Sequence, residues 1–424
     1  MSLLAACFVL SSCHKDDDDS ATDSPRTVVL YMAAQNSLGS GSFLKSDSTE
    51  IATAAQYIRP ADGRLIVFID DASLPRLYEV TAEGFQFVKR YDTDLDSADP
   101  ATLRQVLDDA ALLAPAADYG LILWSHATGW LPPSGQKTTA TRQRSFGIDV
   151  GDGSMSKNRK ADGTYGSEMS LSDLAQAVSA SSIHHARYIM FDACMMGQLE
   201  VAYALRQVAD HLVASPIAID ATGANYVSLL QSGVLLRGTA DDIARRYVSD
   251  YSTRQWGVVQ ASVRLDRLEA LAAATRELLP FTQATGRQSV DMTGVLSYTG
   301  YGSGTLYRPY AYDAREAMAR LLGRSADDSQ PLADAQAEAA WQAWTKALSA
   351  AVTYWGSTTT FYVERSAYTG DYCSCGQGST GLAMFVPQTV YTTNAAKATA
   401  YGDLNLAFRQ TGWYAAAGWE QTGW

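Results

Sequence analysis

The stretch "RYIMFDACMMGQLEVAYAL", residues 187–205, joins an apolar run to a segment in which apolar side chains recur at helical spacing. The run "RYIMFDAC" has the length and the continuous apolar character of a strand that is buried on both faces. The residues after Gly197 follow the three- and four-residue spacing of an amphipathic helix. Cys194 therefore falls at the end of a predicted strand, on the turn that leads into a helix.

This alternation of strands and helices extends over the first half of the chain. The predicted strands are short and apolar and cover residues 27–33, 64–70, 120–126, 187–194 and 211–216. A small hairpin follows the second strand, and predicted helices cover residues 46–58, 101–114, 171–180 and 196–209. Continuous apolar strands that alternate with helices indicate a mostly parallel sheet with helices on both faces, which is an α/β/α sandwich.

The chain of 424 residues is long enough for more than one domain. We predict a lipoprotein signal at residues 1–13 and a polar tether rich in Asp and Ser at 14–25. The α/β domain then covers residues 26–258. Residues 259–424 are expected to form an α-rich region with a few extra strands, because long helical patterns dominate there.

The N-terminal run "MSLLAACFVLSSC" is apolar and ends in small residues and Cys13. Its last four residues fit a lipidation signal. The "HKDDDDS" that follows resembles the acidic export signal of bacterial surface lipoproteins, although a solvated charge run or a stray calcium-binding tract would have the same composition. We predict an outer-membrane lipoprotein, lipidated at Cys13 and displayed on the cell surface. No later stretch reaches the roughly 20 apolar residues of a membrane span, so the lipid is the expected membrane anchor.

Composition and charge exclude some classes of function. A hydrophobic content of 47% with 18% charged residues is that of an ordinary globular protein. The formal net charge of −12 argues against nucleic-acid binding, which needs a basic face.

The cysteines and histidines suggest a nucleophile and its base. Cys373 and Cys375 lie in a loop without further metal ligands, which leaves Cys194 as the thiol to explain. A thiol nucleophile needs a nearby base, and of the five histidines His126 alone ends a predicted strand. In parallel sheets, reactive groups gather beyond the carboxyl ends of the strands. We therefore expect Cys194 and His126 to form a catalytic pair, although a histidine at a strand end also caps turns.

A small-residue turn, "ATGW", follows His126. Backbone N–H groups on such a turn can point at a bound carbonyl oxygen. We predict that the N–H groups of Ala127 and Cys194 form an oxyanion hole.

In several stretches the chain resembles the clostripain family of cysteine peptidases, which are relatives of caspases and gingipains. The matching stretches are "VVLYMAAQNSL" (28–38), "LILWSHATGW" (121–130), "YIMFDACMMGQLEVAYAL" (188–205), "LVASPIAIDATGANY" (212–226) and "GLAMFVPQ" (381–388). The resemblance implies a caspase-like α/β sandwich, a Cys–His dyad, cleavage after Arg or Lys, and frequent self-cleavage between the His and Cys blocks. Family members usually carry glycines directly after the histidine, where this chain has Ala127 and Thr128.

Asp192 is the residue that we expect to select the substrate side chain. It lies two positions before Cys194 on the same strand, so both side chains face the same side. A carboxylate at the floor of the pocket for the substrate residue before the cleaved bond (P1) can pair with a guanidinium or ammonium group. The alternative is a structural aspartate that caps the following helix. Asp220 is a second candidate carboxylate for this pocket, or else a turn residue.

The polar segment 131–169 lies between the two blocks and contains Lys157, Arg159 and Lys160. Segments without apolar periodicity are common sites of proteolytic nicking. Because the resemblance implies self-cleavage here, we expect a cut between Lys160 and Ala161, with Arg159 as the nearest alternative. A solvated basic patch in a loop is the other interpretation.

Together these features predict a surface-anchored cysteine endopeptidase that acts on peptides or proteins with Arg or Lys at P1. No cofactor is expected, and a need for calcium stays open. The alternative is a catalytically silent lipoprotein that uses a caspase-like pocket to bind peptides.

Overall fold

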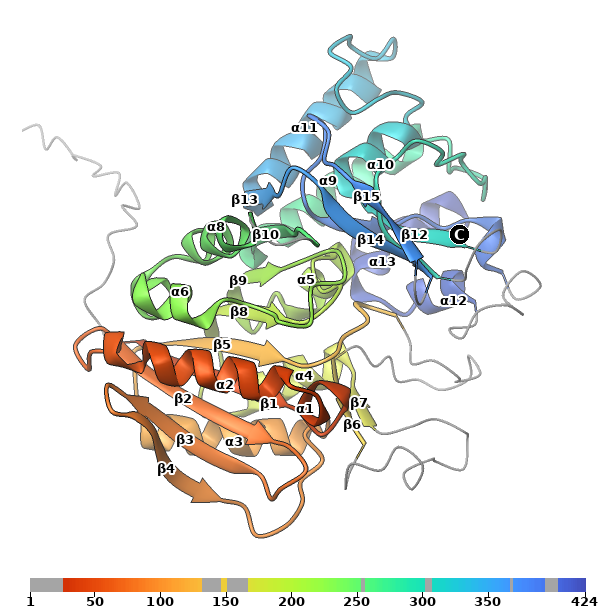
Figure 1. The fold of residues 1–424 in the computed structure, drawn as a ribbon. Helices are drawn as coiled ribbons and strands as arrows, with labels where there is room; N and C mark the ends of the chain where they lie inside the picture. Colours follow the sequence, from red (N-terminus) through yellow and green to blue (C-terminus); the bar gives the residue numbers. More distant parts are fainter. Residues whose placement is uncertain are drawn as a thin grey trace, which may run out of the picture.

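A nine-stranded sheet runs through the molecule, and helices cover both of its faces (Figure 1). The structure is a computed structural model that describes residues 26–131, 146–150, 167–252, 256–301, 307–366, 369–392 and 403–424. The strand order is β13 (Val352–Ser357), β10 (Val259–Arg264), β9 (Ala209–Ala214), β8 (Ala186–Asp192), β5 (Asp118–Trp124), β1 (Arg26–Ala33), β2 (Gly63–Asp70), β3 (Arg76–Thr81) and β4 (Gly84–Arg90).

The five strands from β9 to β2 are parallel to one another. The outer strands add antiparallel pairs on either side, β3 and β4 beside β2, and β10 and β13 beside β9. In register, Trp124 of β5 pairs with Asp192 of β8. Because parallel strands point the same way, the turns that follow β5 and β8 lie side by side beyond the carboxyl ends of the strands. We call this side of the sheet the carboxyl edge.

Two separate cores lie on the two faces of the sheet. On β1, the side chains of Val28 and Leu30 belong to one core, whereas those of Val29 and Tyr31 belong to the other. The first core includes α2 (Phe43–Ala54), α6 (Tyr226–Gln231), α7 (Val234–Arg237) and α8 (Ala240–Tyr251). The second includes α3 (Pro100–Leu113), α4 (Leu171–Ala180), α5 (Leu199–Leu205), α9 (Leu268–Leu278) and α11 (Ala335–Ala351). This arrangement confirms the predicted α/β/α sandwich and explains why the strands are apolar throughout.

The central sheet continues past the boundary that we predicted at residue 258. That boundary lies between β9 and β10, and both strands belong to the same sheet. The rest of the C-terminal region contains α10 (Ala314–Leu321), α12 (Leu404–Phe408), α13 (Gly412–Ala416) and two small sheets. These sheets are β11 (Ser297–Tyr301), β12 (Arg308–Asp313) and β16 (Ala383–Phe385), and the pair β14 (Phe361–Ser366) and β15 (Thr369–Cys373).

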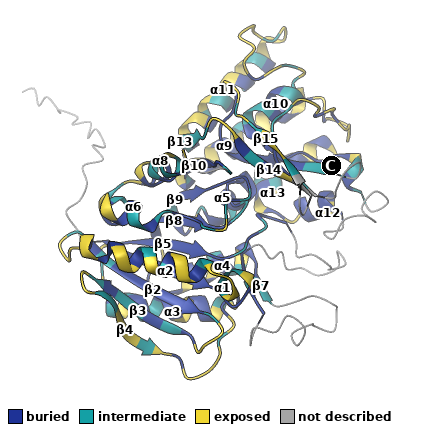
Figure 2. Ribbon diagram, viewed as in Figure 1, coloured by how far each residue is buried: buried dark blue, intermediate teal, exposed yellow. Residues whose placement is uncertain are grey.

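Burial follows the same plan, with the central strands buried and the outward faces of the helices exposed (Figure 2). One buried polar contact ties a helix to the sheet, since Trp124 Nε1 donates to Asp47 Oδ2 of α2 over 2.7 Å. Within the ranges given above, none of the helices has the length and apolar character needed to cross a bilayer.

Candidate active site

The two predicted catalytic residues follow neighbouring strands at equal distances. His126 lies two residues beyond Trp124, and Cys194 lies two residues beyond Asp192. Because Trp124 and Asp192 are paired in register, the strands bring His126 and Cys194 to adjacent positions at one edge of the sheet. Both side chains are half-buried, so the edge is sheltered but still accessible.

His126 is held by a residue that the sequence analysis did not single out. Its Nε2 atom lies 2.8 Å from the hydroxyl of Ser37, on the short helix α1 (Ser37–Ser40) that follows β1. Its Nδ1 atom makes no hydrogen bond to any residue that the structure describes. Burial lowers the pKa of His126 below its usual value, so the imidazole is neutral at neutral pH. A neutral imidazole is able to accept a proton.

Asn36 connects the turns after β1 and β5. Its Nδ2 group donates to the carbonyl oxygens of Ala33 and Ile148, both over 2.8 Å. It also lies 3.3 Å from the hydroxyl of Ser125, which itself donates to the Ala33 carbonyl over 2.8 Å. Its side-chain oxygen accepts from Leu38 N and begins α1. These bonds fix the residues on either side of the contact between His126 and Ser37.

Cys194 carries a protonated thiol. Its Sγ atom lies 4.0 Å from the carbonyl oxygen of Ile219, and it makes no hydrogen bond to His126. Burial raises the pKa of the Cys194 thiol to about 11, and the negative charges of Glu364 and Asp192 act in the same direction. At neutral pH the pair is therefore a thiol beside a neutral imidazole, rather than a thiolate–imidazolium ion pair.

The residue after the nucleophile has a strained backbone. Met195 has a φ angle of +62°, in the left-handed region that non-glycine residues rarely adopt. Its N–H donates to Ile217 O over 2.9 Å. Its sulfur accepts from Thr299 Oγ1 of β11 over 3.5 Å and from Tyr310 Oη of β12 over 3.9 Å. Strands of the C-terminal region therefore contact the turn that carries Cys194.

The predicted oxyanion groups remain available. The N–H groups of Ala127 and Cys194 donate no hydrogen bond to the described residues of the chain. The turn that carries Ala127 needs glycine at one position only. Gly129 has a φ of +72°, and a Cβ atom there would lie 2.6 Å from the side-chain nitrogen of Gln198. Ala127 and Thr128, which replace the usual glycines, are compatible with this turn.

Asp192 is almost completely buried, at 3% exposure. Its carboxylate accepts from Ala224 N at 3.0 Å, from Tyr226 Oη at 2.9 Å and from Tyr247 Oη at 3.2 Å. The N-cap of the following helix α5 is Gln198, so the alternative role of Asp192 as the cap of that helix is wrong. Asp192 instead fixes the turn that leads into α6, on the side of the sheet toward which Cys194 packs.

Asp220 is a turn residue close to the nucleophile. Its Oδ1 atom accepts from the N–H of Thr222 over 2.9 Å and from its hydroxyl over 2.8 Å. It directly follows Ile219, whose carbonyl faces the Cys194 thiol. The turn geometry leaves Asp220 half-buried at the same edge as the predicted pair.

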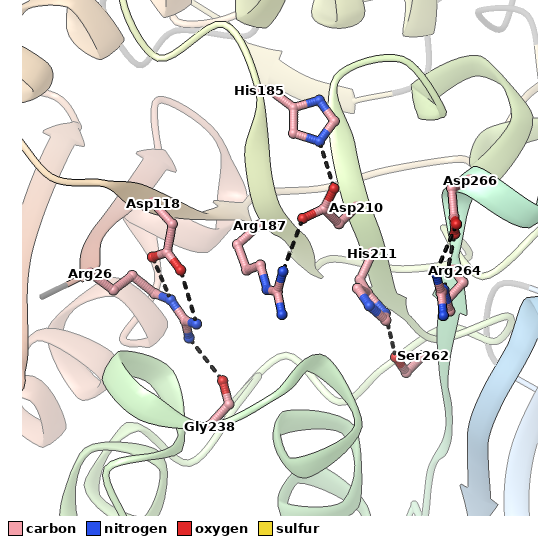
Figure 3. A network of polar contacts seen from close by, with 10 residues as sticks. All are labelled: Arg26, Asp118, His185, Arg187, Asp210, His211, Gly238, Ser262, Arg264 and Asp266. Atoms are coloured by element: carbon pink, nitrogen blue, oxygen red, sulfur yellow. Dashed lines mark hydrogen bonds and ion pairs between the residues drawn. The ribbon is translucent and has the colours of Figure 1, made fainter. Parts of the chain in front are cut away.

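Two other histidines lie near the amino ends of β8 and β9 (Figure 3). His185 immediately precedes β8 and its Nε2 atom is 2.8 Å from Asp210. His211 is near the start of β9, with Nδ1 3.5 Å from the hydroxyl of Ser262. Likewise, the start of β1 is joined to the start of β5 by an ion pair between Arg26 and Asp118 of 3.0 Å. These polar contacts join neighbouring strands near their amino ends, whereas Cys194 follows the carboxyl end of β8.

The remaining predicted residues do not add to this site. Cys375 is a free thiol, and Cys373 is the last residue of β15. Among the residues with a described position, no group of three His, Cys, Asp or Glu side chains is arranged to hold a metal ion. Cys13, Lys160 and Ala161 lie outside the described residues.

Several residues of the site were missed because they come from distant parts of the chain. Ser37 follows a predicted strand closely, so the rule that placed His126 at a carboxyl edge would also have indicated Ser37. Tyr226 and Tyr247 carry no comparable signal, since nothing in their local sequence distinguishes them from packing residues.

Comparison with known proteins agrees with this geometry. The sequence pattern of the clostripain family matches residues 30–395. A secreted C11 cysteine protease from Bacteroides thetaiotaomicron, solved with an irreversible peptide inhibitor, is similar with a TM-score of 0.72 and 26% identity. An inactive zymogen C11 protease from Parabacteroides distasonis is similar with a TM-score of 0.70 and 25% identity. Each match covers 93% of this chain and 99% of the other.

No curated protein sequence gives a significant match. The family pattern covers most of the chain, and the two structures match over nearly their whole length. The fold is therefore the caspase-like sandwich of these proteases. The chain belongs to the clostripain family of cysteine peptidases.

Proposed function

We propose that the protein is an endopeptidase in which Cys194 attacks the scissile carbonyl and His126 transfers the proton. The observation that carries this proposal is the pairing of β5 with β8, which places the thiol and the imidazole at adjacent strand ends. The N–H groups of Ala127 and Cys194 support it, because they donate no hydrogen bond within the described ranges and an acyl transfer site needs donors for the developing oxyanion.

The protonation states of Cys194 and His126 define the first step of the proposed reaction. In the tautomer whose Nε2–H donates to the Ser37 hydroxyl, Nδ1 is unprotonated and takes the thiol proton as the sulfur attacks the carbonyl carbon. The C–S bond forms while the carbonyl electron pair moves onto oxygen, between the two N–H donors. The imidazolium then gives its proton to the departing amine as the C–N bond breaks. Water attacks the resulting thioester with His126 as its base, which frees the acid product and restores the thiol.

The first prediction concerns the catalytic pair. Cys194→Ala should abolish peptidase activity because no other group forms the thioester. His126→Ala should lower kcat by at least about 10³-fold, since the buried thiol then loses its base. The measurement is turnover of a fluorogenic peptide, with the melting temperature as a check of folding. His185→Ala is the matched control and should keep normal turnover. Near-normal turnover of His126→Ala would remove the assignment.

The raised pKa of Cys194 also predicts how the alkylation rate of its thiol depends on pH. Because the pKa of Cys194 is raised to about 11, the thiolate fraction should still be increasing above pH 9. The rate of alkylation by iodoacetamide should therefore climb across pH 6–10 without a plateau. Mass spectrometry of the Cys194 peptide separates this reaction from labelling of Cys373 and Cys375. A plateau near neutral pH would show a preformed thiolate instead.

We also propose that Asp192 selects Arg or Lys at P1. Its carboxylate is almost completely buried and faces the side of the sheet toward which Cys194 packs. An amide and two phenol hydroxyls hold it in one orientation. A guanidinium or ammonium group that reaches this carboxylate gains a charge-assisted hydrogen bond, which a neutral side chain does not form. Asp220 provides a second carboxylate at the same edge.

The second prediction concerns this preference. Asp192→Asn should lower kcat/KM for P1 Arg and Lys substrates by about 10²-fold, because the charged pair is lost. Substrates with a neutral P1 residue should change much less. A fluorogenic panel that varies P1 alone measures both effects. Tyr247→Phe is the control, since it removes one hydroxyl from Asp192 but leaves the charge. A wild-type preference for an acidic or apolar P1 residue would contradict the proposal.

We further propose that the enzyme cuts its own chain between Lys160 and Ala161. The flanking strands β6 (Phe146–Asp149) and β7 (Ser167–Met169) pair with each other, with Asp149 opposite Ser167. Phe146 also pairs with Ala127, so β6 begins beside the residue that follows His126. One similar structure is described as an inactive zymogen, which supports a precursor form in this family.

The third prediction concerns this cleavage. Intact-mass analysis of the purified wild type should show two associated fragments that divide after Lys160, whereas Cys194→Ala should remain one chain. Replacing Arg159 and Lys160 together by Gln should also keep the chain intact, because the P1 charge is lost. Equal cutting of Cys194→Ala in a protease-free preparation would show that another enzyme is responsible. A wild type that stays uncut and fully active would show that no cleavage is needed.

Finally, we propose that lipid on Cys13 anchors the enzyme to the outer membrane, at the cell surface. The tether of residues 14–25 precedes Arg26 at the start of β1, whereas Cys194 follows the carboxyl end of the parallel strand β8. An anchor on this side supports an orientation with the catalytic edge away from the membrane. The fourth prediction is that Cys13→Ser moves the protein from the membrane fraction to the soluble fraction. Membrane retention of Cys13→Ser would exclude this anchor.

A further inference from the structure

The side-chain amide of Gln198 lies where the turn after Cys194 meets the turn after His126. Gln198 is four residues beyond Cys194 and is fully buried, at 0% exposure. Its amide packs against Gly129, which is three residues beyond His126. A Cβ atom at Gly129 would lie 2.6 Å from Nε2 of Gln198 and 2.9 Å from both Cδ and Oε1. These similar distances indicate that the flat face of the amide lies on the Gly129 backbone.

Neither helix capping nor a polar anchor explains this contact. Gln198 is the N-cap residue of α5, but its side chain accepts no hydrogen bond from that helix. Neither Nε2 nor Oε1 forms a hydrogen bond with any residue whose position the structure describes. The contribution that remains for the amide is steric, because it limits how closely Gly129 approaches α5.

Each of the two turns is also held by a neighbour of its own. On the side of the nucleophile, Gly197 N donates to Ser215 O over 2.8 Å. On the side of the base, Gly147 N donates to His126 O over 3.1 Å. The two turns are therefore attached to different parts of the fold, and the Gln198 amide sets the spacing where they meet.

This spacing matters for the oxyanion hole that we propose, because its two donors lie on different turns. The Ala127 N–H is two residues before Gly129, and the Cys194 N–H is four residues before Gln198. Such donors stabilise an oxyanion only when they lie about 3 Å from the position that it occupies. A displacement of about 1 Å can cost about 10²-fold in rate. Movement of Gly129 toward α5 would therefore disturb the hole.

We propose that Gln198 is a positioning residue, whose buried amide sets the distance between the two donors of the oxyanion hole through its contact with Gly129. This inference rests on the proposed peptidase function and adds to it a residue that does not touch the substrate. It also gives a reason for the glycine at position 129, since a Cβ atom there would displace the amide.

The fifth prediction concerns the volume of this side chain. Gln198→Ala should lower kcat by about 10- to 10²-fold with little change in KM, because Gly129 then relaxes into the emptied space while the pocket at Asp192 is untouched. Gln198→Met should keep most of the turnover, since methionine is also unbranched and fills a similar volume. Turnover of a fluorogenic peptide is measured for each variant, together with its melting temperature.

Two inhibitors separate positioning from a general loss of stability. The aldehyde of the best-cleaved peptide adds reversibly to Cys194, since sulfur bonds to the carbonyl carbon and the thiol proton ends on the carbonyl oxygen. Its oxygen then lies in the proposed oxyanion hole. The inhibition constant of this aldehyde should rise in Gln198→Ala by the factor by which kcat falls. The corresponding alcohol cannot add the thiol and should bind as it does to the wild type.

A double variant tests the contact itself. Gly129→Ala should nearly abolish turnover, because the new Cβ atom meets the Gln198 amide and the φ of +72° is unfavourable for alanine. Adding Gln198→Ala removes the amide that this Cβ atom meets. The double variant should therefore turn over faster than Gly129→Ala alone, which is the sign of direct coupling between the two positions.

Gln260→Ala is the matched control, because Gln260 of β10 is also fully buried and its amide forms no hydrogen bond within the described ranges. It should lower the melting temperature and leave kcat and both inhibition constants near their wild-type values. An unchanged kcat in Gln198→Ala, or equal losses in aldehyde and alcohol binding, would overturn the positioning role. Failure of the wild type to cut any peptide would count against the proposed function itself, so the two results are distinguishable.

Discussion

One constraint positions His126 and Cys194, the parallel pairing of β5 with β8 in a fixed register. A shift of one residue would turn every side chain of a strand to the opposite face, and both faces of this sheet are buried. Trp124 fixes the register on β5, because its ring is buried and its Nε1 atom is bonded to Asp47 of α2. The same register sets His126 beside Cys194. The packing of the core thus also determines the geometry of the site.

The turn that carries Cys194 and Met195 is held by contacts from two separate parts of the chain. A left-handed backbone at a non-glycine residue costs on the order of 1–3 kcal/mol, and surrounding contacts have to offset that cost. Met195 receives these contacts from Ile217, which follows β9, and from Thr299 and Tyr310 of the C-terminal region. Since β10 and β13 also complete the central sheet, the C-terminal region shares this sheet and also contacts the turn that carries Cys194.

The sequence predicted the fold class because continuous apolar strands and helices alternate so regularly, and the structure confirms it. The same pattern led to His126 and Cys194, since both follow strands whose carboxyl ends share an edge. The extent of the sheet was missed, because β10 and β13 are antiparallel edge strands separated by about ninety residues in sequence. Tyr226 and Tyr247 were missed for a related reason. Tertiary contacts between distant elements bring them to the site, and local patterns do not record such contacts.

The surroundings of the thiol set the resting protonation state of Cys194. Burial raises the pKa of the thiol to about 11, and the negative charges of Glu364 and Asp192 act in the same direction. Under the proposed mechanism the sulfur therefore reacts only as its proton passes to His126. A substrate cation that paired with Asp192, as we propose, would cancel part of the negative charge that disfavours the thiolate, so that binding of a basic residue and formation of the reactive sulfur would be linked.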